Sequence, residues 1–218
     1  MPNYVPMSVR IAILISGRHG RGSNMAAIAG ACQSGQVDGG VALVIGNSRS
    51  SPALARAAEM GIATRTIASD QPENAYSQAL LTALTDARID LVCLAGYMRK
   101  VPDAVVAAYS GRLMNIHAAL LPAFGGQGMY GSHIHGAVLE YGAKISGCTV
   151  HFVDEHYDTG PIICQSVVAV EETDTPETLA ARVLVAEHET YPRAVALYAA
   201  KRLTMDGRRV RIEPPPVN

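Results

Sequence analysis

Apolar runs of strand length alternate with stretches of helical periodicity along the first half of the chain. The runs at 8–16, 41–45 and 89–95 are rich in aliphatic residues and each ends beside a glycine, which is typical of buried parallel strands. Apolar residues recur at helical spacing at 24–32, 52–60 and 74–87, and 62–67 is consistent with an edge strand. This alternation predicts an α/β fold with an open, mostly parallel, Rossmann-like sheet and helices on both faces.

The pattern changes near Gly147. Residues 147–153 alternate as a strand does, and 162–170 form the partner expected across a turn at 158–161. Thr175 is the expected N-cap and Pro176 the first residue of a helix that breaks near Pro192, before a second short helix at 193–201. We expect one domain over residues 1–218, with a lead-in at 1–7 and a polar, proline-rich tail at 207–218.

Composition narrows the classes of protein. The chain has 218 residues, of which 49% are hydrophobic, so it can bury one sizeable core. A net charge of -1 gives no overall field that favours nucleic acid, and we expect small-molecule partners and a monomer or homodimer. No apolar run approaches the roughly 20 residues that span a bilayer. Four scattered cysteines without a secretory leader predict a reduced, cytoplasmic protein.

The strongest candidate chemistry lies at the end of the run 113–117. An extended conformation places Asn115 and His117 on one face and points Ile116 into the core. An amide can stabilise an oxyanion and an imidazole can move a proton, so the pair suits a reaction in which charge develops on a carbonyl oxygen. The same residues also fit a turn cap beside a hydrogen-bonded structural histidine, and the pair alone leaves both interpretations open.

A glycine-rich turn at 17–24 joins the first strand to the first helix. Backbone N–H groups at a helix N-terminus form an anion site, most naturally for phosphate. The order of the glycines differs from the dinucleotide fingerprint, and Ser23 stands where a P-loop has its lysine. The turn therefore favours a monophosphate, with a simple tight turn as the alternative.

Two further features are weaker on their own. Ser132-His133-Ile134-His135, with His151 downstream, places two imidazoles on one face if the segment is a strand, but no third ligand has a telling spacing, so we expect no metal. Asp158 lies in a turn bounded by glycine and proline, where an aspartate commonly forms only an Asx-turn.

Taken in order, these segments resemble a known family over nearly the whole chain. The motifs are GRGSN at 20–24, LAGYMRKV at 94–101, NIHAALLP at 115–122 and HFVDEHYDTGPII at 151–163. They are similar to the phosphoribosylglycinamide formyltransferases, folate-dependent enzymes of purine synthesis. The resemblance implies a single formyltransferase domain that uses 10-formyltetrahydrofolate as co-substrate and phosphoribosylglycinamide as acceptor.

The resemblance also implies residue roles. Asn115 and a protonated His117 would stabilise the oxyanion, while Asp158 would keep the imidazole charged. Glu187 matches the residue that meets the glycinamide end of the acceptor. The residues that match the phosphate site are Gly22, Ser23 and Asn24; those that match the folate wall are Met98, Arg99, Lys100 and Val101; those that match the pterin loop are Asp154, Glu155, His156, Tyr157 and Asp158.

The chain departs from the family pattern at several positions. Ala118-Ala119 replaces a Pro-Ser, the glycine loop is longer than the short S-G-x-G-S-N form, and Glu73 stands near the place of a basic residue. A formyltetrahydrofolate deformylase, with water as acceptor, and an inactive ribonucleotide-binding module are the alternatives. A methionyl-tRNA formyltransferase is disfavoured, because no basic patch is present for RNA.

Overall fold

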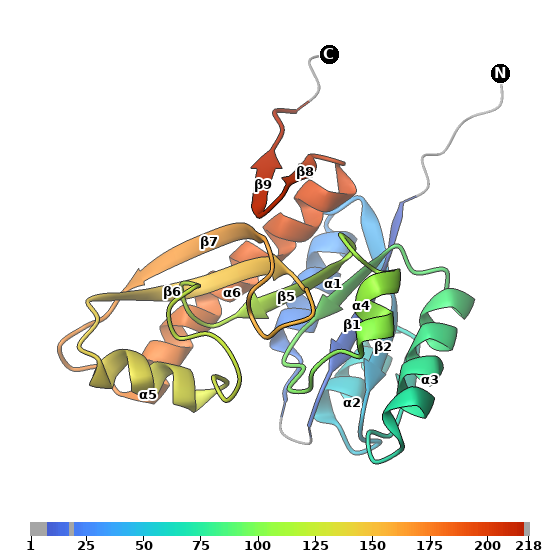
Figure 1. The fold of residues 1–218 in the computed structure, drawn as a ribbon, viewed down its shortest axis with the longest axis horizontal. Helices are drawn as coiled ribbons and strands as arrows, with labels where there is room; N and C mark the ends of the chain where they lie inside the picture. The colour runs from blue at the N-terminus through green and yellow to red at the C-terminus, as the bar shows by residue number, and fades with distance from the viewer. Residues whose placement is uncertain (1–7, 18–19, 216–218) are drawn as a thin grey trace.

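A computed structural model describes residues 8–17 and 20–215. Within them nine strands form one sheet in the order β3-β2-β1-β4-β5-β6-β7-β9-β8 (Figure 1). Pairs from β3 to β5 are parallel, whereas β6 is antiparallel to both β5 and β7. The strands are β1 Val9–Ile15, β2 Gly39–Gly46, β3 Thr64–Thr66, β4 Leu91–Leu94, β5 Leu113–His117, β6 Ile145–Phe152, β7 Ile162–Ala169, β8 Leu203–Asp206 and β9 Arg209–Ile212.

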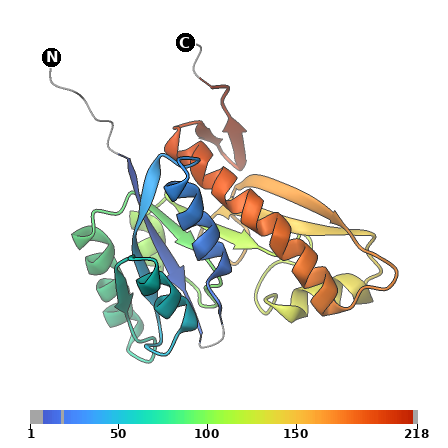
Figure 2. The same ribbon diagram turned by 180° about the vertical axis from the view of Figure 1, so that it is seen from behind.

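Helices cover both faces of the sheet, as the alternation of buried residues requires. In β1, Ile11 and Ile13 pack towards α1, α2 and α6, while Ala12 and Leu14 pack towards α3 and α4. Seen from behind, the long helix α6 crosses the sheet beside α1 (Figure 2). The predicted fold class is confirmed. The helices are α1 Ser23–Gln33, α2 Pro52–Glu59, α3 Glu73–Asp86, α4 Asp103–Ala108, α5 Ser132–Glu140 and α6 Pro176–Ala199.

The predicted start of α6 is confirmed and its predicted break is wrong. The Thr175 side chain accepts a hydrogen bond from the Thr178 amide at 3.3 Å, and Pro176 is the first helical residue. The helix nevertheless continues through Pro192 to Ala199. Proline removes one backbone donor, but its neighbours Tyr191, Ala194 and Val195 are fully buried. Tertiary packing therefore holds the helix across a residue that local propensity disfavours.

The predicted tail at 207–218 is also corrected. Residues Leu203–Asp206 and Arg209–Ile212 pair as an antiparallel hairpin around Gly207, and β9 adds to the sheet beside β7 at Ile162. The sequence pattern does not indicate β9, because the side chains of this arginine-containing strand are mostly exposed and show little apolar alternation. The expected lead-in at 1–7 lies outside the described residues. Within the described part of the chain, no helix is long and apolar enough to cross a membrane.

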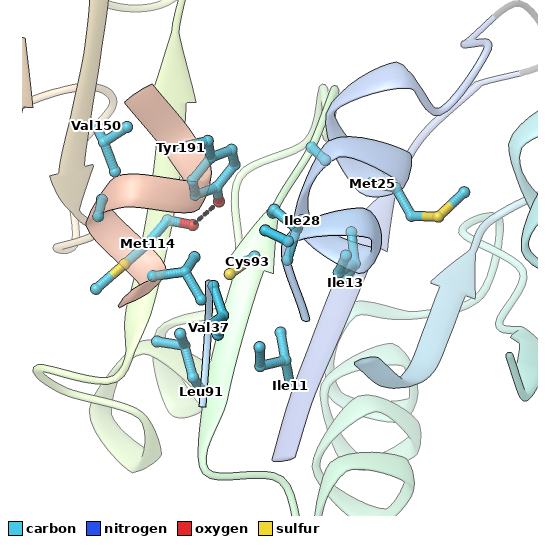
Figure 3. Packing of buried hydrophobic residues seen from close by; sticks show 14 of the residues in the cluster. Ile11, Ile13, Met25, Ile28, Val37, Leu91, Cys93, Met114, Val150 and Tyr191 are labelled. Atoms are coloured by element: carbon cyan, nitrogen blue, oxygen red, sulfur yellow. Dashed lines mark hydrogen bonds between the residues drawn. The ribbon is translucent and has the colours of Figure 1, made fainter. Parts of the chain in front are cut away.

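Tyr191 joins α6 to the centre of the sheet. It is completely buried, and its hydroxyl donates to the Met114 carbonyl at 3.0 Å and to the Leu94 carbonyl at 3.1 Å. Figure 3 shows this contact within the apolar cluster formed by Ile11, Cys93 and their neighbours. The two carbonyls lie near the ends of β4 and β5, so the tyrosine fixes the part of the sheet from which Asn115 and His117 project.

We predict that Tyr191→Phe lowers the free energy of unfolding by about 1 to 2 kcal/mol, because two buried carbonyls lose their shared donor. Urea denaturation followed by circular dichroism measures the change. Tyr141→Phe is the matched control, because Tyr141 is 82% exposed and should change stability by less than about 0.5 kcal/mol. Equal stability of the wild type and Tyr191→Phe would contradict this role.

Candidate active site

The loops after β1, β4 and β5 lie at the carboxyl ends of the parallel strands, where open α/β sheets bind their ligands. The Ser16 amide donates to the Gly96 carbonyl at 3.1 Å, and the Met98 amide donates to Ser16 Oγ at 3.1 Å. A cavity of about 760 Å³ opens beside these loops. Its lining includes most of the candidate residues: Asn24, Met98, Arg99, Lys100, Val101, Asn115, His117, Asp154, His156, Tyr157, Asp158 and Glu187.

Strand geometry places Asn115 and His117 together, and the antiparallel strand β6 adds a histidine. Asn115 is directly opposite His151 in the β5–β6 register. His151 Nδ1 lies 2.8 Å from the Phe152 carbonyl, and its Nε2 lies 3.6 Å from Asp158 Oδ1. That Nε2 lies 3.2 Å from Asn115 Nδ2. The histidine therefore lies against both the Asn115 amide and the Asp158 carboxylate.

His117 lies between two acceptors. Its Nε2 is 2.8 Å from the Phe124 carbonyl, and its Nδ1 is 3.5 Å from Asp158 Oδ2. Both contacts favour a proton on the ring nitrogen, so the geometry favours the imidazolium. Burial opposes this, because the side chain is only 5% exposed. Burial lowers the pKa of His117 below its ordinary value, while Asp158 and the Phe124 carbonyl act in the raising direction.

The expectation that Asp158 keeps the imidazole charged is therefore right only in the direction of its effect. In the structure burial outweighs the carboxylate, so the pKa of His117 is lowered overall. The Asp158 carboxylate can be recognised in the sequence motif. The burial of His117 depends on the folded structure and cannot be read from the motif.

Asp158 has long-range partners and is not merely an Asx-turn residue. Its backbone is left-handed, with φ 56, which aspartate tolerates better than most residues. Oδ2 accepts from the Gly126 amide at 2.9 Å, and Oδ1 lies 3.4 Å from Asn115 Nδ2. Burial alone would raise the pKa of Asp158, but His151, the charge of His117 and the Gly126 amide together lower it. The local turn is closed instead by Asp154, which accepts from the His156 amide at 3.0 Å.

The glycine-rich turn leads directly into α1. Gly22 precedes the helix with φ 65, and a Cβ there would lie 2.9 Å from the Cβ of Ala53. The glycine is thus required by packing against α2 as well as by any ligand. Ser23 begins the helix, and Asn24 faces the cavity. Arg18 and His19 of this turn lie outside the described residues.

Asn24 connects the glycine turn to α6. Its Nδ2 donates to Glu187 Oε2 at 2.6 Å, and its Oδ1 is buried without a hydrogen-bond partner in the part of the chain that the structure describes. Glu187 is 8% exposed, and burial raises the pKa of its carboxyl group while the Asn24 amide opposes this. The two predicted acceptor-site residues are therefore in direct contact.

Of the predicted folate residues, all but Glu155 line the cavity, and their exposures differ. Met98 is 54% exposed and Val101 is buried, while Lys100 pairs with Asp103 at 2.7 Å on the surface. Arg99 lies over the Tyr76 ring and donates to the Ser69 carbonyl. In the loop that follows β6, Glu155 is exposed and Tyr157 is 38% exposed at the edge of the cavity.

The segment at 132–135 is the start of α5, so the strand that would align its two imidazoles for a metal is not formed. Gly131 precedes a helix in which His133 is exposed and His135 is 4% exposed and faces the cavity. Helical spacing separates the two imidazoles that a strand would have aligned. Among residues 8–17 and 20–215, no group of three or more His, Cys, Asp or Glu could hold a metal ion.

His151 is the site residue that the sequence does not indicate: it contacts Asn115 and Asp158, whereas the sequence pattern suggests at most a metal ligand. The available signal was its place in a strand next to Leu113–His117, but pairing register is not visible in one sequence.

Comparison with known proteins agrees with this geometry. Residues 9–195 match the formyl transferase family. The chain belongs to the formyl transferase family. A solved glycinamide ribonucleotide transformylase 1 from Symbiobacterium toebii is similar with a TM-score of 0.88 and 42% identity, covering 95% of each chain.

Two curated relatives of this formyl transferase carry the name phosphoribosylglycinamide formyltransferase. The Escherichia coli protein is 38% identical over 199 residues, which is 90% of each chain. The chloroplastic protein of Arabidopsis thaliana is 41% identical over 204 residues, which is 92% of this chain and 69% of the relative. The chain spans 62% of the Vigna unguiculata protein of the same name, so some relatives are considerably longer.

An ordinary histidine side chain has a pKa of about 6.5. We predict that the pKa of His117 lies below this value, because the side chain is buried. Asp158→Asn should lower the pKa of His117 further, because it removes the opposing negative charge. NMR titration of the imidazole protons measures both. Because the folded state favours the neutral ring, stability should fall as the pH drops below the unfolded pKa, and more steeply in the variant. Asp154→Asn, in the same loop, should leave the His117 titration in place. An unchanged pKa in Asp158→Asn would contradict the coupling.

Proposed function

We propose that the chain transfers the formyl group of 10-formyltetrahydrofolate to the amine of 5'-phosphoribosylglycinamide, a step of de novo purine (IMP) biosynthesis. The observation that carries the proposal is the meeting of Asn115, His117 and Asp158 in one cavity, between the start of α1 and the loop at 96–101. The names of the relatives support the same activity.

In this reaction the acceptor amine attacks the formyl carbon. A carbon–nitrogen bond forms, and the carbonyl electrons move to oxygen as an oxyanion. Asn115 Nδ2 and the His117 ring each turn an N–H group from their long contacts with Asp158, at 3.4 and 3.5 Å, to that oxygen, where they stabilise charge that exists only after attack. Collapse of the oxyanion breaks the bond to N10 of the folate, which takes up a proton as tetrahydrofolate leaves. Asp158 accepts the amine proton directly or through water.

The acceptor binds between α1 and α6 in this proposal. Backbone N–H groups at the N-terminus of α1, around Gly22, Ser23 and Asn24, hold the phosphate. The resemblance assigns Glu187 to the glycinamide end of the acceptor, and the Asn24 amide, which donates to Glu187 Oε2 at 2.6 Å, joins this residue to the phosphate turn. A phosphate at one end and a carboxylate at the other orient the nucleophile.

The folate binds on the opposite wall. Met98 and Val101, with Arg99 and Lys100 between them, form one side, and Asp154, Glu155, His156, Tyr157 and Asp158 form the loop around the pterin ring. The apolar contacts of Met98 and Tyr157 suit an aromatic heterocycle, since both are exposed at the cavity.

Two alternatives differ in the acceptor. A deformylase uses water and needs no site for a phosphate, and an inactive ribonucleotide-binding module needs no catalytic residues. The contact of Asp158 with both Asn115 and His117 favours catalysis, because binding alone does not require it. The pairing of Asn24 with Glu187 favours an acceptor that carries both a phosphate and an amine.

The partners in this proposal are small molecules, and the location is cytoplasmic. All four cysteines are free, which suits a reducing compartment. A monomer or homodimer is the expected assembly.

We predict that His117→Ala and Asn115→Ala each lower kcat by on the order of 100-fold or more, because each removes a donor to the oxyanion. The dissociation constant for 10-formyltetrahydrofolate should change little. His133→Ala is the matched control, since His133 is exposed at the start of α5. Steady-state transfer assays and calorimetry give the two quantities. Near-normal kcat in either active-site variant would remove that residue from the mechanism.

We predict that the formyl group goes to the amine in preference to water. Positioning an acceptor against the formyl carbon can contribute up to about 7 to 11 kcal/mol, and water has no such anchor. Formate release from 10-formyltetrahydrofolate alone should be slow, and tetrahydrofolate formation should rise sharply when 5'-phosphoribosylglycinamide is added. Formate release at the same rate with and without the ribonucleotide would support the deformylase alternative instead.

A further inference from the structure

Two tyrosine hydroxyls meet beneath the loop at 96–101. Tyr76, on α3, is only 2% exposed, and its hydroxyl lies 2.9 Å from the hydroxyl of Tyr97. Tyr97 is half-buried and lines the cavity, whereas Tyr76 lies behind it. The hydroxyl pair therefore connects a helix on one face of the sheet to a residue of the proposed folate wall.

The ring of Tyr76 also contacts Arg99, a positively charged residue of the same loop. The Arg99 guanidinium carbon lies 5.0 Å from the centre of that ring, within the range of a cation–π interaction. The guanidinium also donates to the Ser69 carbonyl, in the segment that precedes α3. Tyr76 thus contacts two loop residues, Tyr97 through its hydroxyl and Arg99 through its face.

The loop is fixed from its other side by the end of β1. The Met98 amide donates to Ser16 Oγ, and the Ser16 amide donates to the Gly96 carbonyl, each at 3.1 Å. Met98, between the two anchors, remains 54% exposed at the cavity. The hydrogen bonds to Ser16 fix the loop on one side, and the pair of Tyr76 and Tyr97 fixes it on the other. The Met98 side chain remains exposed to a ligand in the cavity.

We propose that Tyr76 is a positioning residue that acts through Tyr97 to hold the loop at 96–101 in the shape that receives the folate. This role rests on the proposed function, because it assigns the folate to this wall. Ordering a loop before binding reduces the conformational entropy that the ligand would otherwise have to offset. The hydroxyl pair then contributes to folate affinity, although Tyr76 itself lies behind the residues that face the cavity.

Burial is consistent with an intact pair of neutral phenols. Burial and the neighbouring Tyr76 hydroxyl raise the pKa of Tyr97 well above its ordinary value. The Tyr97 hydroxyl therefore keeps its proton at physiological pH, as the hydrogen bond to Tyr76 requires of a neutral phenol.

The test is a double-mutant cycle on folate binding, with Tyr76→Phe, Tyr97→Phe and the double variant. Phenylalanine keeps the ring under Arg99 and removes only the hydroxyl. Calorimetry with 10-formyltetrahydrofolate, and separately with 5'-phosphoribosylglycinamide, gives each dissociation constant. Tyr76→Phe should weaken folate binding by about 3- to 10-fold, as expected for one buried hydrogen bond, and leave ribonucleotide binding unchanged. In the Tyr97→Phe background the same change should add nothing, because its partner is absent.

Tyr198→Phe is the matched control. Its partly buried hydroxyl donates to the Asp90 carbonyl at 3.2 Å, away from the residues that line the cavity, so it loses a similar hydrogen bond. A loss of melting temperature in both variants, with a change of folate affinity in Tyr76→Phe alone, supports the positioning role. Equal folate affinity of the wild type and Tyr76→Phe, or an additive double variant, would overturn it. Absence of folate binding by the wild-type protein would overturn the proposed function as well, which distinguishes the two failures.

Discussion

A buried imidazole faces an acceptor at each ring nitrogen, and the proposed chemistry depends on how that conflict is resolved. His117 contacts the Phe124 carbonyl and Asp158, which together favour two ring protons, while its near-complete burial favours one. Burial is the largest of these effects, so the pKa of His117 lies below its ordinary value. A substrate that supplies negative charge at the ring would then shift the balance towards the imidazolium. The site is therefore suited to stabilise an oxyanion when it forms, without holding a buried cation at rest.

The change of strand direction at β5 makes this arrangement possible. Parallel strands bring the loops after β1 and β4 to one edge, which is sufficient to bind ligands. The antiparallel strand β6 then places His151 opposite Asn115, and the loop that follows folds back so that Asp158 reaches both Asn115 and His117. Gly160 is required in this loop, since a Cβ there would collide with the Phe152 carbonyl. A uniformly parallel sheet would lack both of these contacts.

The sequence predicted what depends on local patterns and missed what depends on tertiary contacts. Periodicity identified the buried strands, the Asn115 and His117 face and the Thr175 cap, because each is determined within a few residues. Pro192 was expected to end α6, but the burial of Tyr191 and Val195 against the sheet outweighs the lost hydrogen bond. The hairpin β8–β9 was missed because exposed strands lack a strong apolar pattern. The role of His151 and the depth of the His117 pocket could not be foreseen, since both follow from strand register and from segments distant in sequence.

Glu187 links the choice of acceptor to the electrostatics of the site. Its carboxyl group is buried, and within the described residues Asn24 is its hydrogen-bond partner, so losing a proton is unfavourable in the free protein. In the proposed reaction, an acceptor that arrives as an ammonium ion would bring a positive charge next to this group and stabilise the carboxylate. Water offers no comparable gain, because it carries no charge to pair with the buried group. If the amine then passes its proton to the carboxylate, it becomes the neutral nucleophile that attack on the formyl carbon requires. A raised carboxyl pKa at this position thus favours an acceptor that arrives as an ammonium ion and reacts as an amine.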